Sequence, residues 1–293
     1  PSQIPACNLG SLMKTPTPKP GILDISPYVG GKSKAGESQR IIKLSSNENP
    51  YGPSPKAVAA YQAEAAKLHR YPDGGHALLR EAIGKAYGLP AEQLVCGSGS
   101  DELIGLLIHA FAGQGDEVLF SQYGFLMYRI YTLGNGATPV TAPEKNLTAD
   151  INALLAAVTP KTRILFLANP NNPTGSLLPY SEIVRLRRAL REDIILALDA
   201  AYAEYLENDA EDGRALVAEG TNTVVLHTFS KIHGLPALRI GWAYAPAAIV
   251  DVLNRIRGPF NVNSPALAAA AMGLSSVSVV ANSLRLRRLK LTL

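Results

Sequence analysis

Lys231 lies in sequence surroundings that favour a reactive amine. It is the only charged side chain in residues 220–238, a stretch that contains a continuous apolar run. An ammonium group is destabilised in apolar surroundings, so the neutral, nucleophilic amine that Schiff-base chemistry requires is favoured there. The hydroxyls of Thr228 and Ser230 flank the lysine, and together with the guanidinium of Arg239 they form a donor set that suits a phosphate.

A carboxylate ends another apolar run. Asp199 directly follows residues 194–198, and a carboxylate at the end of a buried strand must be solvated, paired with a cation or protonated. Asp199 therefore calls for a positively charged partner. Tyr202 lies three residues further on and brings a phenol to the same place. A solvated aspartate that caps a helix is the alternative interpretation, and it stays open at this point.

Two polar loops also follow apolar runs. Residues 97–102 (GSGSDE) lead into an apolar helix, so their backbone N–H groups and the helix N-terminus suit a phosphate. The loop is no dinucleotide fingerprint, because Glu102 stands where the third glycine would be, and no P-loop lysine follows. Residues 169–175 (NPNNPTG) contain two prolines that can hold an asparagine amide toward a ligand. Each loop taken singly is also compatible with an ordinary turn.

Taken together, the candidate side chains could bind the different groups of a single ligand. They supply an amine for an aldehyde, a carboxylate for a ring cation, an asparagine and a tyrosine for a phenolate oxygen, and donors for a phosphate. These are the groups that pyridoxal 5′-phosphate presents to a protein. The sequence therefore predicts a pyridoxal-phosphate site.

The elements that must position these residues alternate in type. Short apolar runs predict strands at residues 93–96, 117–120, 137–141, 163–168, 194–198, 223–228 and 239–244. Amphipathic runs predict helices at residues 57–68, 76–87, 101–112, 124–133, 150–158, 179–191 and 213–219. Apolar strands separated by helices are typical of an α/β fold, in which a mostly parallel sheet is covered on both faces. Ligands bind at the carboxyl ends of the strands in such sheets, where the candidate residues lie.

The ordered motifs resemble those of the fold-type I, class II-like pyridoxal-phosphate-dependent aminotransferases, and within them the histidinol-phosphate aminotransferase family. The resemblance covers residues 18–274 and depends on residues 44–55, 70–73, 97–102, 169–175, 199–202 and 228–231 with Arg239. It implies a three-layer α/β/α domain and amino transfer between L-histidinol phosphate and 2-oxoglutarate, with glutamate as product, in histidine biosynthesis. An aromatic amino acid aminotransferase and a cofactor-binding chain with weak catalysis are the alternatives.

The resemblance also implies residue roles. Lys231 would bind the cofactor's aldehyde carbon and then act as general base and acid, while Asp199 would pair with the ring nitrogen. Tyr202 and Asn172 would bind the phenolate oxygen, and Tyr123 would stack on the ring. The phosphate would be bound by the side chains of Thr228, Ser230 and Arg239 and by the backbone N–H groups of Ser100, Asp101 and Glu102.

Family members are homodimers with the site at the interface, and three further residues match family positions. Tyr71 matches the tyrosine that reaches the cofactor phosphate of the neighbouring subunit. Asn49 and Tyr51 would lie near the substrate.

Three segments follow from the resemblance. Residues 1–45 are expected to form an N-terminal arm, and residues 46–258 the large cofactor-binding domain. Residues 259–293 are expected to begin a small domain that is truncated and ends in a basic tail. Because the arginines beyond residue 274 match no family motif, none is assigned to the substrate carboxylate.

Composition excludes several classes of protein. The 293 residues are 47% hydrophobic and 18% charged, which suits a large core. Cys7 and Cys96 are the only cysteines, so neither a disulfide framework nor a cysteine-rich metal site is expected, and a reducing, cytoplasmic setting is. The apolar runs fall short of the roughly 20 residues that cross a bilayer, so no membrane association is expected. The whole formal charge of +4 lies in residues 275–293, and the neutral remainder does not suggest nucleic-acid binding.

Overall fold

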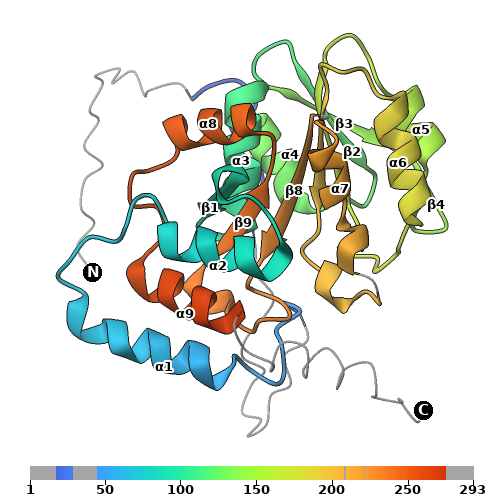
Figure 1. Cartoon of the computed structure of the whole chain (residues 1–293). Coiled ribbons are helices and arrows are strands. Elements are labelled where there is room, and N and C mark those ends of the chain that lie inside the picture. The colour runs from blue at the N-terminus through green and yellow to red at the C-terminus, as the bar shows by residue number, and fades with distance from the viewer. Residues whose placement is uncertain (1–17, 29–44, 208, 221, 275–293) are drawn as a thin grey trace, which may run out of the picture.

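A seven-stranded sheet lies between two layers of helices in the computed structural model, which describes residues 18–28, 45–207, 209–220 and 222–274 (Figure 1). The predicted three-layer α/β/α architecture is therefore confirmed. Most of the predicted arm and the whole predicted basic tail lie outside the described residues. None of the helices in the described ranges is long and apolar enough to cross a membrane.

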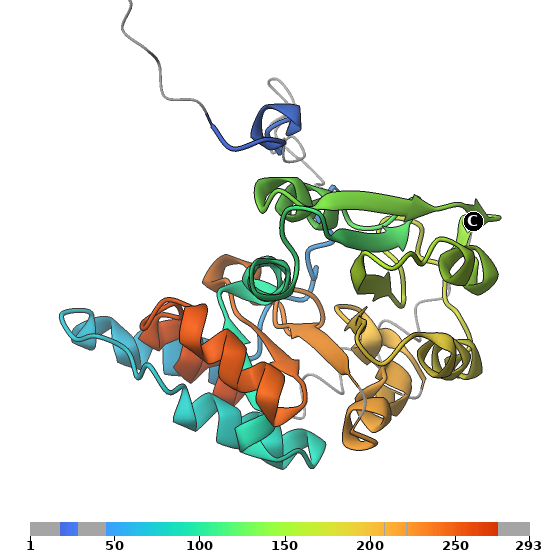
Figure 2. The same cartoon turned by 90° about the horizontal axis from the view of Figure 1, so that it is seen from above.

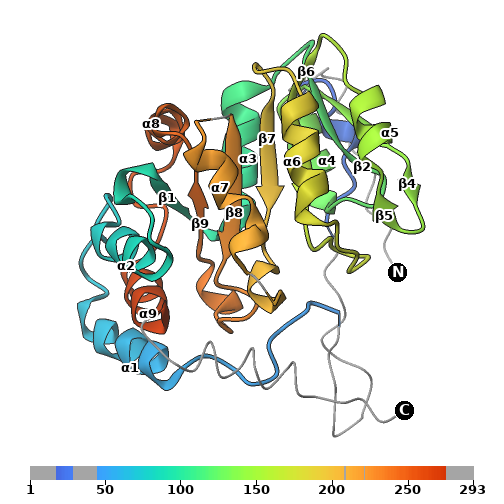
Figure 3. The same ribbon diagram turned by 45° about the vertical axis from the view of Figure 1, so that its right-hand side comes forward.

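The sheet has the strand order β1-β9-β8-β7-β6-β2-β3. The strands are β1 Leu94–Gly97, β2 Glu117–Ser121, β3 Thr138–Ala142, β6 Thr162–Ala168, β7 Ile195–Asp199, β8 Thr223–Thr228 and β9 Gly241–Tyr244. Pairs from β8 to β3 are parallel, whereas β9 runs antiparallel to β8 and β1. The carboxyl ends of β1, β6, β7 and β8 therefore meet the amino end of β9 at one edge of the sheet (Figure 3).

Every predicted strand is present, with ends that differ by at most two residues from the prediction. The largest difference is at β9, because Arg239 adopts a left-handed conformation (φ 50°) and ends the short 3₁₀ helix Pro236–Leu238. β9 reverses direction since the chain between it and β8 contains no crossover helix, which a parallel return would need. That reversal brings Arg239 to the edge where β7 and β8 end.

Helices cover both faces of the sheet. One face is covered by α3 Gly99–Phe111, α4 Leu126–Gly134 and α8 Ala247–Ile256. The other is covered by α1 Pro55–Glu64, α2 Ala77–Tyr87, α5 Ile151–Ala156, α6 Tyr180–Ala189, α7 Arg214–Ala218 and α9 Ser264–Leu274. A two-stranded hairpin, β4 Glu144–Lys145 and β5 Thr148–Ala149, precedes α5.

Local signals explain the helix ends. Ser54 Oγ accepts a hydrogen bond from the backbone N–H of Ala57 at 3.2 Å, and Pro55 occupies the first helical position of α1. Gly88 ends α2 in a left-handed conformation (φ 68°), which a glycine adopts at low cost.

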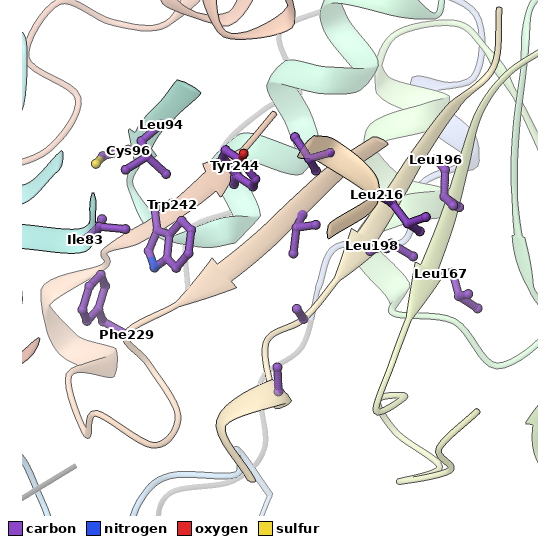
Figure 4. Packing of buried hydrophobic residues seen from close by; sticks show 14 of the residues in the cluster. Ile83, Leu94, Cys96, Leu167, Leu196, Leu198, Leu216, Phe229, Trp242 and Tyr244 are labelled. Atoms are coloured by element: carbon purple, nitrogen blue, oxygen red, sulfur yellow. The ribbon is translucent and has the colours of Figure 1, made fainter. Parts of the chain in front are cut away.

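The sequence prediction missed α8 and α9. Alanines fill much of α9, and they let it pack closely on α1 and α2, with which it forms one group (Figure 2). Its buried residues join the same apolar cluster as Trp242 and Phe229 of the central sheet region (Figure 4). Helix α9 thus packs against α1, α2 and the core, and the boundary predicted at residue 258 stays a prediction.

Candidate active site

A cavity of about 520 Å³ opens at the carboxyl edge of the sheet. The loops after β1, β6, β7 and β8 and the loop before β9 contribute to its wall. Segment 45–48 also lines it, and this segment crosses below the strand ends (Figure 3). The predicted site residues that line the cavity are Ser100, Asp101, Asn172, Asp199, Tyr202, Thr228, Ser230, Lys231 and Arg239.

Lys231 follows β8 and presents its amine to the cavity. Its Nζ donates a hydrogen bond to the backbone carbonyl of Ser46 at 3.1 Å and lies 5.6 Å from the ring centre of Tyr202. Burial lowers the pKa of the Lys231 amine, and the nearby charge of Arg239 lowers it further, against opposition from Asp199 and Glu48. The amine is thus easier to deprotonate than an exposed lysine, as a nucleophile or general base requires.

Asp199 is a buried carboxylate at the end of β7, only 7% exposed. Its Oδ2 accepts a hydrogen bond from Tyr128 Oη at 2.7 Å, and its Oδ1 accepts one from the backbone N–H of Ala201 at 3.2 Å. Burial raises the pKa of Asp199, although both hydrogen bonds and the charges of His227 and Lys231 oppose that shift. Within the described ranges no cation forms a salt bridge with this carboxylate, so a cationic ligand group would stabilise its ionised form.

Tyr202 and Asn172 flank the lysine and the aspartate. Tyr202 Oη accepts a hydrogen bond from Asn47 Nδ2 at 2.9 Å, and burial raises the pKa of this phenol. Asn171 turns its amide inward to the carbonyl of Tyr123 and the hydroxyl of Thr174. The neighbouring Asn172 lines the cavity, and its side chain has no hydrogen-bond partner among the residues that the structure describes.

One corner of the cavity has the donors of an anion site. Arg239 Nη1 donates to Ser230 Oγ at 3.3 Å, and the Ser230 backbone N–H donates to Thr228 Oγ1 at 3.1 Å. The first turn of α3 begins beside them, and its N-terminal N–H groups carry the positive end of the helix dipole. A Cβ on Gly241 would lie 2.3 Å from the backbone nitrogen of Ser100, so only glycine permits this close approach.

Two residues predicted for the ring and the phosphate do not line the cavity. Tyr123 is 42% exposed, whereas Phe125 from the same loop reaches the wall. The Glu102 carboxylate accepts hydrogen bonds from the backbone of Ser98 and from Asn261, so it fastens the start of α3.

The remaining predicted residues lie around the site. Asn49 Nδ2 donates to the backbone carbonyl of Ile232 at 2.7 Å, next to the lysine. Tyr51 is 40% exposed and does not line the cavity. Tyr71 is 82% exposed, stacks on Phe260 with ring centres 4.7 Å apart and does not line the cavity.

Sequence reasoning missed Phe125 and Tyr128, which both touch the site. They lie three residues apart, at the start of α4, and therefore on the same side of that helix. This three-residue spacing in the sequence indicates that the two rings share one helix face, but it does not show whether that face meets the sheet.

Comparisons with known proteins identify the family of the chain. The family model for aminotransferase class I and II matches residues 39–292. The chain belongs to the class I and II aminotransferases. This aminotransferase is 56% identical, over 92% of its length and 75% of the relative, to a histidinol-phosphate aminotransferase of Rhodopseudomonas palustris (strain TIE-1). It is 60% identical, over 88% of its length and 71% of the relative, to one of Paramagnetospirillum magneticum.

A solved structure gives the same result for the fold. The crystal structure of the histidinol-phosphate aminotransferase from Sinorhizobium meliloti, in complex with pyridoxal-5′-phosphate, has a TM-score of 0.79 and 29% identity. The match covers 83% of this aminotransferase and 66% of that chain, so the present chain spans about two thirds of the solved one.

The cavity residues of this aminotransferase fit pyridoxal phosphate, the cofactor of the family. The buried carboxylate of Asp199 calls for a cation, which a pyridinium nitrogen would provide. Gly241 lets the first turn of α3 pack beside Arg239 and Ser230, and the donors gathered there suit a phosphate. The amine of Lys231 lies in the same cavity.

Proposed function

We propose that this chain transfers the amino group of L-histidinol phosphate to 2-oxoglutarate, with pyridoxal phosphate as cofactor, in histidine biosynthesis. One observation carries the proposal: Lys231, Asp199 and Arg239 converge in one cavity at the carboxyl edge of the sheet. The substrate is supported by the relatives of 56% and 60% identity, which are histidinol-phosphate aminotransferases.

The cofactor supplies an aldehyde that condenses with the substrate amine and a pyridine ring that takes up the electrons released when the substrate carbon loses a proton. The side chains of Ser230, Thr228 and Arg239 would hold its phosphate together with the first N–H groups of α3. Asp199 would keep the ring nitrogen protonated. Tyr202 and Asn172 would bind the phenolate oxygen.

Lys231 would move the proton between substrate atoms. Its lowered pKa leaves a larger fraction of the amine neutral and able to accept a proton near neutral pH. The Ser46 carbonyl, which now accepts a hydrogen bond from Nζ, would keep the amine directed across the cavity. Tyr123 and Phe125 from the same loop are the candidates for packing on the face of the ring, and Phe125 lines the cavity.

Asn49 and Tyr51 remain candidates for substrate binding. Asn49 bonds to the backbone beside Lys231, and its Oδ1 accepts a hydrogen bond from the backbone N–H of Tyr51 at 2.9 Å. The cavity-lining residues 45–48 directly precede Asn49, which supports a place near the substrate for this segment.

A homodimer with shared sites, located in the cytoplasm, completes the proposal. Tyr71 and Phe260 form an exposed aromatic pair, and Tyr61 and Leu68 expose further apolar surface on the same part of the chain. An exposed aromatic pair is typical of an interface. Tyr71 would then bind the phosphate in the cavity of the other subunit. Tyr71→Ala should weaken cofactor binding in a sample that light scattering shows to be dimeric.

Steady-state assays test the substrate. The cofactor-loaded protein should form glutamate from 2-oxoglutarate with L-histidinol phosphate as donor, and with a higher kcat/KM than with L-phenylalanine or L-tyrosine. A higher value for the aromatic amino acids would replace the proposed substrate. No turnover with any donor, in protein that retains the cofactor, would identify a chain that binds the cofactor without catalysis.

A further inference from the structure

A buried ionic cluster lies on the face of β8 that packs against α7. We call it the His227 cluster, and it consists of His227, Glu204, Asp212 and Arg214. His227 Nδ1 lies 3.2 Å from Glu204 Oε1, and its Nε2 lies 2.9 Å from Asp212 Oδ2. Arg214 Nε lies 2.7 Å from the same Asp212 oxygen. The His227 and Asp212 side chains are 1% and 0% exposed, so this contact is closed to solvent.

The histidine in this cluster is the charged imidazolium. Both ring nitrogens face carboxylates, and only the charged form can donate from both. Burial opposes the charge, but the hydrogen bonds to Asp212 and Glu204 outweigh burial and raise the pKa of His227 to about 9. The ring also stacks on Trp242 with centres 4.2 Å apart, where Figure 4 shows the indole within the apolar cluster.

The His227 cluster connects the two loops that carry the catalytic groups. Glu204 lies two residues after Tyr202, in the short 3₁₀ helix that follows β7. His227 directly precedes Thr228 at the end of β8. The loop beyond adds His233, two residues after Lys231, whose Nε2 lies 4.0 Å from Glu204 Oε1.

We propose that Glu204 and His227 are positioning residues, whose ion pair sets the distance between Tyr202 and Lys231 in the cavity. The proposal depends on the proposed function, because it concerns the cofactor site. A contact between the two loops would hold Tyr202 and Lys231 in one relative position. Residues that support a binding site from outside commonly orient its side chains in this way.

Stabilisation of the fold does not by itself explain the buried charges of the His227 cluster. Taking charges out of water is costly, and well-packed apolar residues often stabilise a core as much as a buried ion pair does. An ion pair differs from apolar packing in its direction, because its hydrogen bonds specify one arrangement of the groups. In this cluster the hydrogen bond joins Glu204, in the loop that carries Tyr202, to His227, on the strand that ends at Thr228.

Other charged and titratable groups surround His227. Arg214 and Asp212 approach from α7 and the segment before it, Tyr87 approaches from α2 with its ring centre 6.0 Å away, and Asp199 lies on the neighbouring strand. Burial lowers the pKa of His233, so that ring is neutral at neutral pH. His227 is therefore the group of this cluster that changes charge between neutral and alkaline pH.

The test compares His227→Gln and Glu204→Gln with a control, Arg187→Leu. Arg187 is another buried cation, but its guanidinium bonds to backbone carbonyls at the start of β7, at the opposite end of that strand from Asp199. The measurements are the dissociation constant for pyridoxal phosphate, the pH midpoint of the absorbance change of the bound cofactor, and the melting temperature.

The proposal predicts that both glutamine variants bind the cofactor about tenfold more weakly, as expected when one partner of a buried charged pair is removed. Their absorbance midpoint should also move by about half a pH unit or more, because the distances around Lys231 change. The control should lose melting temperature without either effect. Glutamine variants that melt earlier but keep the wild-type cofactor affinity and midpoint would overturn the proposal.

His227→Arg keeps a cation on β8 and tests the proposal even if the glutamine variants do not fold. Wild-type cofactor affinity should fall more steeply between pH 8 and pH 10 than that of His227→Arg, because arginine keeps its charge there. Equal pH dependence in the two proteins would contradict a role for the imidazolium. If the wild-type protein itself takes up no cofactor through Lys231, the proposed function fails instead, and the two failures are thereby distinguished.

Discussion

Tyr128 donates a hydrogen bond to Asp199 at 2.7 Å, across 71 residues of sequence and from a helix to a strand end. The tyrosine is 1% exposed and stacks on Phe166 with ring centres 4.7 Å apart, so its hydroxyl has one fixed direction. Tyr128 thereby stabilises a carboxylate whose pKa burial raises.

Tyr128→Phe should keep the fold and weaken the site. Phenylalanine preserves the stacking on Phe166, whereas Asp199 loses a donor to its charged form, so its pKa should rise further. We expect about a tenfold loss of kcat and weaker cofactor binding. Tyr244→Phe is the control, because the Tyr244 hydroxyl makes no hydrogen bond with the described residues. Equal kinetics for Tyr128→Phe and wild type would show that this hydrogen bond is not needed.

Gly241→Ala should disturb the phosphate corner. The added Cβ would meet the backbone of Ser100 at 2.3 Å and the carbonyl of His227 at 2.8 Å, and neither can move without shifting α3 or β8. Overpacking of this kind costs about 1–3 kcal/mol, and we expect weaker cofactor binding in addition. Gly113→Ala has open space around its Cβ and should change neither property. Urea unfolding and cofactor titration of both variants check the prediction.

Arg187→Leu should destabilise the protein without altering catalysis. Arg187 is 5% exposed, and its guanidinium donates to the carbonyls of Ile194, Leu190 and Arg191, which would lose their partners. We expect a loss of about 3 kcal/mol in the free energy of unfolding, since unsatisfied buried acceptors are costly. Activity per mole of folded protein should stay at the wild-type value. A loss of kcat in the folded Arg187→Leu protein would show that the backbone around Arg187 affects the geometry of the cavity.

Alkaline pH should weaken the fold through His227. Its pKa is raised from 6.5 to about 9 on folding, so its contribution to stability is fully present below pH 6.5 and is lost as pH rises through about 9. The free energy of unfolding of the wild type should therefore fall between pH 6.5 and pH 9.5. His227→Arg should show a smaller fall, and an identical fall would assign the pH dependence to other groups.

The apolar runs predict the strands of the sheet correctly. The loops after these strands lie together because a parallel sheet brings the carboxyl ends of its strands to one edge. Lys231, Asp199 and Arg239 are far apart in sequence, yet each lies next to a strand end that the apolar pattern marks. Their convergence follows from topology, without any side-chain detail.

The position of Tyr123 outside the cavity lining has a local cause. Tyr123 lies two residues after β2, but its backbone N–H donates to Glu144 and its carbonyl accepts from Asn171, so the loop turns before Phe125 meets the cavity. These contacts come from β4 and from the loop after β6, and a local pattern contains no information on them. The same holds for Tyr128, whose partner is 71 residues away.

Helix α9 was missed for another reason. Its residues are apolar and small on almost every side, so it lacks the one-sided pattern that marks an amphipathic helix. Helix α9 lies between α1 and the core, so both of its sides are covered. This position explains why its residues are apolar on almost every side.

A single-turnover experiment tests the central claim most directly. L-Histidinol phosphate is added without 2-oxoglutarate to the protein loaded with pyridoxal phosphate, and the visible absorbance of the bound cofactor is followed. We predict that this absorbance is replaced by that of the cofactor's amine form, that 2-oxoglutarate restores it, and that Lys231→Ala shows neither change. Unchanged absorbance in wild-type protein that demonstrably holds the cofactor would contradict the assignment of this cavity as an amino-transfer site.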